Sequence, residues 1–331
     1  MFKSFHMRKF AGIFIISAVV AAGSFGRAEA QGFPNKPIRV VMPVSAGSGP
    51  DTVVRQIGEK LTRTWGQPFI VDNKPGANGW IAIGEAKRSP ADGYTLLMMD
   101  NAYVALQPLL YKKLPHDIAK NLEPVAPLYT THFFIAVATD SPYKTVADLV
   151  AAARAKNGQM TYGTWGIGSV AHLGTSKLEK ATGATMTHVP YKELPQLYTD
   201  VATGAVDWAF GSAATTGPLY RSKKLRYLAI AAPKRLAEFS DVPTVSESGG
   251  PADFELKSWV ALYGPKGISK ETVLKINDGV NKALTEPDSR ERLAGFGFQP
   301  WSASPADVLK AAAEDTRRFT PLVKQLRISL D

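Results

Sequence analysis

The residues best suited to chemistry are small ones, gathered where a strand is predicted to turn into a helix. Val40 to Val44 form a short, mostly apolar run typical of a buried strand, and Ser45 to Pro50 follow as a cluster of small and turn-forming residues. Apolar residues then recur at helical spacing as far as Leu61, and Ser48 or Asp51 can cap that helix. Such a turn points free backbone N–H groups and the positive end of the helix dipole at one spot, which predicts an anion site. Glycines that only allow a tight turn explain the pattern equally well.

A second glycine-rich turn also joins a strand to a helix. Gly166 to Ala171 fit the dinucleotide pattern G-x-G-x-x-A, but His188 stands where an acidic residue for the ribose is expected. A dinucleotide-dependent enzyme is therefore the distant alternative. The same backbone, helped by the hydroxyls of Thr164 and Ser169, can donate to a carboxylate instead.

Aromatic residues near these turns give a weak indication of the ligand. Trp165 lies inside the second turn, and Tyr103 and Tyr129 lie at other predicted strand ends. A tryptophan beside a polar, glycine-rich loop suits a wall against a flat ligand, although packing in the core explains it equally well.

Residues for catalysis or metal binding are poorly represented. The chain has no Gly-x-Ser-x-Gly nucleophile turn and no cysteine. The histidines after the leader, His116, His132, His172 and His188, form no His-x-x-x-His pair and are interpreted as structural. We therefore predict a protein that is not an enzyme and that needs no metal or cofactor.

The N-terminus predicts export. Lys3, Arg8 and Lys9 precede an apolar run from Ala11 to Phe25, and Ala28-Glu29-Ala30 fits a signal-peptidase site, so residues 1–30 are interpreted as a signal peptide cleaved after Ala30. The leader carries four basic residues and one acidic residue, so its removal lowers the net charge from +10 to +7. The remaining basic residues are scattered, which argues against nucleic acid and favours an anionic small molecule. No later apolar run is long enough to span a membrane, and a soluble mature protein is expected.

The order of predicted elements favours an α/β protein with two doubly wound domains. Predicted strands and helices alternate through the chain: strands at Pro68 to Asp72, Tyr94 to Met99, His132 to Thr139 and Met160 to Tyr162, and helices at Ile81 to Lys87, Thr145 to Lys156 and about Pro305 to Gln325. Ligands of such folds lie at the carboxyl ends of the strands, so Asp100 to Tyr103 should face the first turn. We expect residues 31–130 with 232–331 to form one lobe and residues 131–231 the other, facing each other across a cleft.

Linked motifs along the chain resemble one family. VVMPVSAGSGPDTVVRQIGEKL, YGTWGIGSVAHL, FSDVPTVSESG and W-x-x-L-Y-G-P-K-G occur in the order found in the Bug family, the periplasmic solute-binding proteins of tripartite tricarboxylate transporters. The resemblance implies a type II, Venus-flytrap binding protein in the periplasm, joined by a hinge and monomeric. It also implies that the protein closes on a small carboxylate and presents it to a two-component membrane permease.

The resemblance also implies that the two turns bind the ligand, through Ser45, Ala46, Gly47, Ser48, Gly49 and Asp51 and through Thr164, Trp165, Gly166, Gly168 and Ser169. We add four residues at the ends of other predicted strands: Asn101, Tyr103, Gly211 and Ser212. The chain departs from the family pattern at several positions. Val44-Ser45 replaces an aromatic residue and a proline, Gly47-Ser48-Gly49-Pro50 replaces paired glycines, Gln107-Pro108 replaces Asn-Pro, Trp165 replaces a small residue, and Gly211 replaces a common aspartate. Loss of that acid removes a partner for a ligand ammonium. We therefore expect an aromatic mono- or dicarboxylate such as terephthalate, with an aliphatic di- or tricarboxylate, or a carboxylate sensor, as the alternatives.

Overall fold

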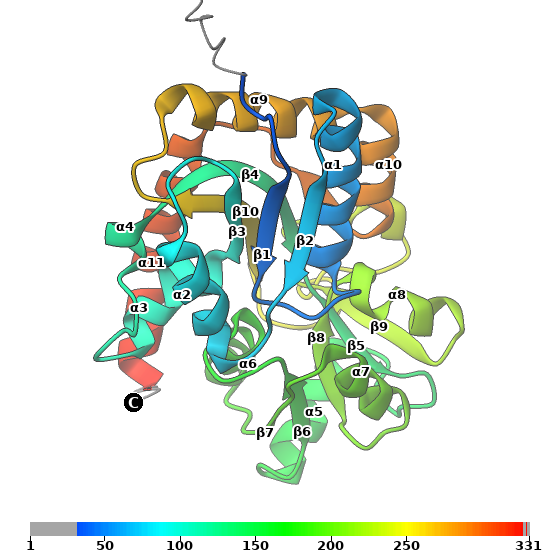
Figure 1. Cartoon of the computed structure of the whole chain (residues 1–331). Helices are drawn as coiled ribbons and strands as arrows, with labels where there is room; N and C mark the ends of the chain where they lie inside the picture. The colour runs from blue at the N-terminus through cyan, green and yellow to red at the C-terminus, as the bar shows by residue number, and fades with distance from the viewer. Residues whose placement is uncertain (1–31, 327–328, 330–331) are drawn as a thin grey trace, which may run out of the picture. The chain divides into compact units, whose positions relative to one another are not determined.

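Short apolar strands alternate with amphipathic helices in the computed structural model, which describes residues 32–326 and residue 329 (Figure 1). The predicted signal peptide lies outside the described residues. Residues from Lys36 onward cluster as one unit, and this unit holds two separate sheets.

The first sheet has the strand order β11-β4-β10-β3-β1-β2. Its strands are β1 (Ile38–Met42), β2 (Phe69–Asn73), β3 (Thr95–Asp100), β4 (Leu122–His132), β10 (Lys257–Pro265) and β11 (Phe298–Pro300). β1 pairs in parallel with β2 and β3, whereas β10 runs antiparallel between β3 and β4. The carboxyl ends of β1, β3 and β4 and the start of β10 therefore share one edge.

The second sheet has the order β7-β6-β8-β5-β9. Its strands are β5 (Phe134–Ala138), β6 (Thr161–Thr164), β7 (Thr187–Pro190), β8 (Trp208–Gly211) and β9 (Leu225–Ile230). β6 pairs in parallel with β7 and β8, and β5 runs antiparallel to β8 and β9. Each sheet thus combines a parallel part, with helical connections, and antiparallel strands.

Helices follow most of the parallel strands. They are α1 (Gly49–Trp65), α2 (Trp80–Arg88), α3 (Gln107–Leu110), α4 (Ile118–Asn121), α5 (Val146–Lys156), α6 (Val170–Thr182), α7 (Leu194–Ala202), α8 (Ala213–Arg221), α9 (Lys270–Thr285), α10 (Pro287–Gly295) and α11 (Pro305–Leu326), with the short turns η1 (Ala77–Gly79), η2 (Ala102–Leu106) and η3 (Ala237–Phe239). The predicted cap at Thr145 is present as a full capping box with Asp148. Most predicted elements are found within one or two residues of their expected limits.

The chain passes between the two sheets near His132. The predicted strand His132 to Thr139 is wrong as one element, because β4 ends at His132 and β5 begins at Phe134. The first sheet takes its strands from residues 38–132 and 257–300, and the second from residues 134–230. The exact lobe boundaries stay a prediction.

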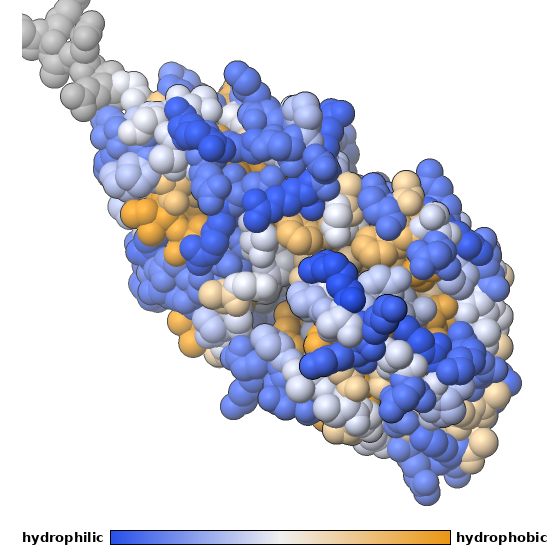
Figure 2. Space-filling view, turned by 90° about the vertical axis from the view of Figure 1, so that its right-hand side faces the viewer, coloured by the Kyte–Doolittle hydropathy of each residue, from blue (hydrophilic) through white to orange (hydrophobic). Residues whose placement is uncertain are grey.

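The view turned by 90° shows a face that is mostly hydrophilic, with apolar residues in separate areas (Figure 2). Among the described residues, no helix combines the length and the apolar character needed to cross a membrane.

Candidate ligand-binding site

A cavity of about 750 Å³ lies between the shared edge of the first sheet and the turns of the second. This size suits a small organic ligand. The loop after β1 contributes Pro43, Val44, Ser45, Ser48 and Pro50 to its wall. The second sheet contributes mainly the turns that precede its helices: Trp165, Gly166, Ile167, Val170, Lys192, Glu193, Ser212 and Thr215.

The N-terminus of α1 carries an unpaired, buried hydroxyl beside this cavity. Ser48 holds the N-cap position, yet its side chain makes no cap hydrogen bond. The residue is 6% exposed, its Oγ has no hydrogen-bond partner among the described residues, and it lines the cavity. A buried hydroxyl without a partner carries a desolvation cost, so an acceptor at this point would be stabilised.

Asp51 braces the same turn from within. Its carboxylate accepts the Gly47 N–H at 2.9 Å, Arg55 Nε at 3.0 Å and Asn73 Nδ2 at 2.9 Å. Burial alone raises the pKa of Asp51, but the hydrogen bonds from Arg55, Gly47 and Asn73 outweigh burial and hold the pKa below its usual value. Asp51 is 3% exposed and does not line the cavity, so it fixes the loop that carries Ser48.

The N-terminus of α8 meets α1 across the cavity wall. A Cβ added at Gly49 would lie 3.2 Å from Ala214 Cβ and 2.8 Å from Phe298 Cζ, so glycine permits the close approach. Ser212 stands at the N-cap of α8, and its Oγ lies 3.1 Å from Thr215 Oγ1. Two helix N-termini and their N-cap serines thus lie at the wall of one cavity, an arrangement suited to a carboxylate.

The turn between β6 and α6 uses its hydroxyls internally. Ser169 Oγ accepts the His172 N–H as the N-cap of α6. Thr164 is fully buried, and its Oγ1 lies 2.6 Å from His188 Nε2. Gly166 and Gly168 adopt φ values of 128° and 79°, which favour glycine. This turn therefore offers backbone and Trp165 to the cavity, rather than the two hydroxyls.

Aromatic rings make up much of the wall. Tyr129 stacks on Phe298 with ring centroids 4.3 Å apart, and both residues line the cavity. The ring centroids of Trp165 and Phe133 lie 5.5 Å apart, and both residues also line the cavity. Trp165 packs against the core and also lines the cavity, so its role as a wall against a flat ligand stays a prediction.

The charged side chains of the wall are Asp100, Lys192 and Glu193. Glu193, before α7, accepts a hydrogen bond from Ser45 Oγ at 2.9 Å, which joins the two sides of the cavity. Burial raises the pKa of Asp100 to about 6, against the opposing effect of N–H donors from Ala102 and Tyr103. No group of histidines and carboxylates that could hold a metal occurs within the described residues.

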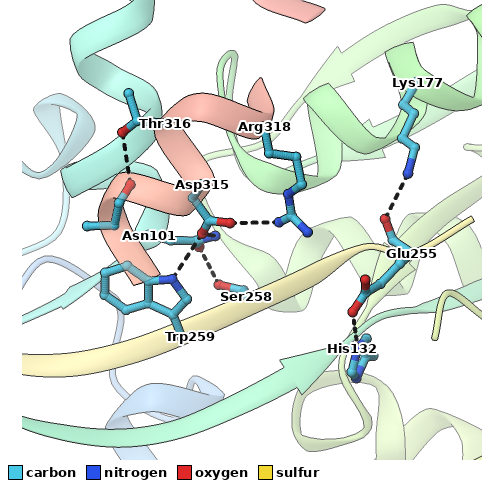
Figure 3. Close-up of polar contacts among 10 residues, drawn as sticks. Asn101, His132, Lys177, Glu255, Ser258, Trp259, Asp315, Thr316 and Arg318 are labelled. Atoms are coloured by element: carbon cyan, nitrogen blue, oxygen red, sulfur yellow. Dashed lines mark hydrogen bonds and ion pairs between the residues drawn. The ribbon is translucent and has the colours of Figure 1, made fainter. Parts of the chain in front are cut away.

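The structure brings only part of the predicted site to the cavity. Ser45, Ser48, Tyr103, Trp165, Gly166 and Ser212 line it, whereas Ala46, Gly47, Gly49, Asp51, Asn101, Thr164, Gly168, Ser169 and Gly211 do not. Asn101 is fully buried and donates to Asp315 at 2.8 Å (Figure 3). A Cβ at Gly211 would lie 2.5 Å from Thr216 Cγ2, so packing alone excludes the larger aspartate.

Asp100 and Glu193 were absent from the predicted site. The signal for Asp100 was its place at the carboxyl end of a strand, but the importance of Glu193 depends on a contact across 148 residues of chain. Local patterns do not report such a contact.

The family model for the tripartite tricarboxylate transporter family receptor, TctC, matches residues 53–328. The chain belongs to this family. Protein BugT of Bordetella pertussis is 30% identical over 315 residues, with 95% of this chain and 95% of BugT covered. A relative from Bordetella bronchiseptica is 31% identical over 314 residues, with 95% of this chain and 92% of the relative covered. The resemblance to the Bug family is confirmed.

Solved structures of TctC-type proteins share the fold. An R. palustris protein solved with adipate is 30% identical, has a TM-score of 0.86 and covers 90% of this chain and 99% of its own. MatC of Rhodopseudomonas palustris, solved with malate, is 27% identical, has a TM-score of 0.80 and covers 88% of this chain and 100% of its own. The periplasmic binding protein BugD is 26% identical, with a TM-score of 0.80, 90% of this chain and 99% of its own covered. The two-lobed binding-protein fold is thereby confirmed, in a family of periplasmic receptors rather than enzymes.

Proposed function

We propose that this TctC receptor captures a small organic carboxylate in the cavity and delivers it to the two-component permease of a tripartite tricarboxylate transporter. It acts in the periplasm as a monomer, after cleavage of its leader at Ala30. The preferred ligand is an aromatic mono- or dicarboxylate such as terephthalate.

The observation that carries this proposal is the unpaired hydroxyl of Ser48. It is buried at the N-terminus of a 17-residue helix, belongs to a residue that lines the cavity, and has no hydrogen-bond partner among the described residues. A ligand carboxylate beside it would accept hydrogen bonds from that hydroxyl and from the neighbouring backbone N–H groups, and the helix dipole would stabilise its negative charge. Ser212, at the N-terminus of α8, adds a second donor to the same wall.

The aromatic preference is supported by the rings of the wall, Tyr103, Tyr129, Phe133, Trp165 and Phe298. Flat ligands gain from offset or edge contacts with such rings. An aliphatic di- or tricarboxylate is the alternative, since the similar R. palustris proteins were solved with adipate and malate. A sensor would use the same cavity, and loss of uptake on deletion of the permease genes distinguishes transport from sensing.

A ligand screen on the exported protein tests the proposal. The chain is expressed with its own leader, purified from the periplasmic fraction, and screened by thermal shift against benzoates, terephthalate, adipate, malate, citrate and amino acids, with calorimetry on each hit. A ligand at a hundred times its Kd adds about 2.7 kcal/mol of stability, which raises Tm measurably. Shifts with aromatic acids support the proposed class, and shifts with aliphatic acids alone support the alternative. Absence of binding by any carboxylate contradicts the function.

A further inference from the structure

Asp100 differs from the other charged residues of the cavity wall in its surroundings. Lys192 and Glu193 are exposed, and Glu193 is already bonded to Ser45. Asp100 is half-buried at the last position of β3, opposite Val260 of β10, and both residues line the cavity. It therefore presents a carboxylate from the sheet edge itself.

The Asp100 carboxylate can accept more hydrogen bonds than it receives from the described residues. One oxygen accepts a hydrogen bond from the Ala102 N–H at 2.9 Å, and within the described residues the carboxylate has one further donor, the Tyr103 N–H. No lysine, arginine or histidine of the described chain pairs with it. Since an ionised carboxylate can accept about four hydrogen bonds, a donor from the cavity side would find open positions.

Aromatic neighbours strengthen the effect of this charge. Burial and, after it, the charge of Asp100 raise the pKa of Tyr103 and of Tyr129, so both phenols stay neutral and lie within its field. Tyr129 is further covered by its stack on Phe298. A partly buried carboxylate in an aromatic-rich wall is less screened than a surface acid, so it both attracts donors and repels anions more strongly.

We propose that Asp100 determines ligand specificity. It favours carboxylate ligands that place a hydroxyl or amino donor next to its side chain, and it disfavours ligands that place a second ionised carboxylate at that position. This inference rests on the proposed function, because it assumes that a ligand carboxylate occupies the helix N-termini. Among the carboxylates of the proposed function it ranks hydroxy- or amino-substituted acids above dicarboxylates, and it thereby replaces terephthalate as the preferred example.

The ionisation of Asp100 supports this selection at the pH of assay. A pKa of about 6 leaves the group almost wholly ionised at pH 7.5, the pH of the calorimetry described below. A ligand hydroxyl then makes a charge-assisted hydrogen bond, whereas a second ligand carboxylate meets a like charge.

The test compares ligands that differ only in the group facing Asp100. Calorimetry at pH 7.5 gives Kd values for benzoate, 3- and 4-hydroxybenzoate, the aminobenzoates, isophthalate and terephthalate, together with the aliphatic pair 6-hydroxyhexanoate and adipate. The wild type is compared with Asp100→Asn, which keeps the acceptor for Ala102, and with Asp140→Asn, an exposed charge-matched control outside the cavity wall.

We expect the wild type to bind the best donor-bearing ligand at least about tenfold more tightly than its dicarboxylate counterpart, the factor of one charge-assisted hydrogen bond. Asp100→Asn should reduce that ratio by about tenfold, and Asp140→Asn should leave it unchanged. The inference is overturned if the wild type prefers the dicarboxylate, a result that needs no variant. It is also overturned if Asp100→Asn binds ligand with the ratio unchanged. Failure of every carboxylate to bind overturns the proposed function instead, and this inference with it.

Discussion

Ser48 occupies a helix N-cap and leaves the cap hydrogen bond unmade, although serine is favoured at this position because its hydroxyl normally accepts a backbone N–H. The neighbouring Asp51 instead fixes the loop through Gly47 and Asn73. Asp51 thus holds the turn, and the Ser48 hydroxyl is left for the proposed ligand. A polar group kept buried without a partner is a cost that ligand binding can relieve.

Replacement of Ser48 by alanine should separate binding from stability. We expect Ser48→Ala to weaken carboxylate binding by roughly 1.5 to 3 kcal/mol, the value of a hydrogen bond to a charged group, and to leave the free energy of unfolding unchanged or slightly higher. Calorimetry and urea denaturation measure the two quantities. Ser246→Ala, at an exposed position, is the control. Unaltered affinity would count against the Ser48 contact.

Ser169 should behave in the opposite way. The sequence predicted a ligand contact for its hydroxyl, but the structure shows the hydroxyl as the cap of α6. Ser169→Ala should therefore lower the free energy of unfolding by about 1 kcal/mol and change affinity little, whereas Ser169→Asn should retain the cap. A large loss of affinity in the alanine variant, without a loss of stability, would restore the predicted contact.

Two histidines beside that turn should make stability depend on pH. His172 and His188 stack with centroids 4.5 Å apart. Burial, and then the proximity of His172, lowers the pKa of His188 to about 4, below the ordinary value of 6.5. The folded state therefore binds fewer protons than the unfolded state between pH 6.5 and 4, so stability falls as pH falls through that window.

Thermal unfolding of the wild type and His188→Gln between pH 7.5 and 4 checks this expectation. The Tm of the wild type should fall further on acidification than that of the variant, because glutamine does not bind a proton on unfolding. Parallel curves for the two proteins would show that His188 does not contribute.

At the scale of elements, local patterns predicted what local forces determine. The turn after Val44 and the capped helix at Thr145 were found because glycine, serine and the capping box act within a few residues. β4 was missed because Pro124 and Pro127 argue against a strand, and its pairing with β10 joins residues far apart in sequence. The same limit applies to the candidate site. The two glycine-rich turns were predicted from local sequence, whereas the surroundings of Asp100 arise from tertiary packing.

Helix α11 is held to the first sheet by one buried acid. Asp315 is 8% exposed and accepts Asn101 Nδ2 at 2.8 Å, Trp259 Nε1 at 2.9 Å and Arg318 Nη2 at 2.8 Å (Figure 3). Removal of this acceptor leaves buried donors without a hydrogen-bond partner, which lowers the stability of the folded state.

We therefore expect Asp315→Ala to lower the free energy of unfolding by about 3 kcal/mol, as when one partner of a buried polar network is lost. Urea denaturation measures the change. Glu314→Ala, one position earlier and exposed, should cost little. A small effect of Asp315→Ala would mean that water or neighbouring groups replace its contacts.

At the scale of the whole TctC receptor, contacts near the strand crossing and contacts at the cavity join the same two lobes. The strand crossing near His132 is joined to the segment just before β10, because His132 Nε2 lies 3.0 Å from Glu255 Oε1 (Figure 3). On the cavity side, Ser45 and Glu193 join the two lobes, and Gly49 lies against Ala214. Contacts at the hinge persist in any closure movement, whereas the Ser45 contact must break for the lobes to part.

Loss of the Ser45–Glu193 contact should therefore act mainly on ligand release. We expect Glu193→Ala to raise koff by about two- to fivefold, with a smaller change in kon, because an exposed polar contact contributes up to about 1 kcal/mol and is made only after the lobes meet. Stopped-flow tryptophan fluorescence measures both rates, since Trp165 lines the cavity. Glu238→Ala, exposed and outside the cavity wall, serves as control. Equal koff values for Glu193→Ala and the wild type would show that the lobes are held closed by the ligand and the Gly49 contact alone.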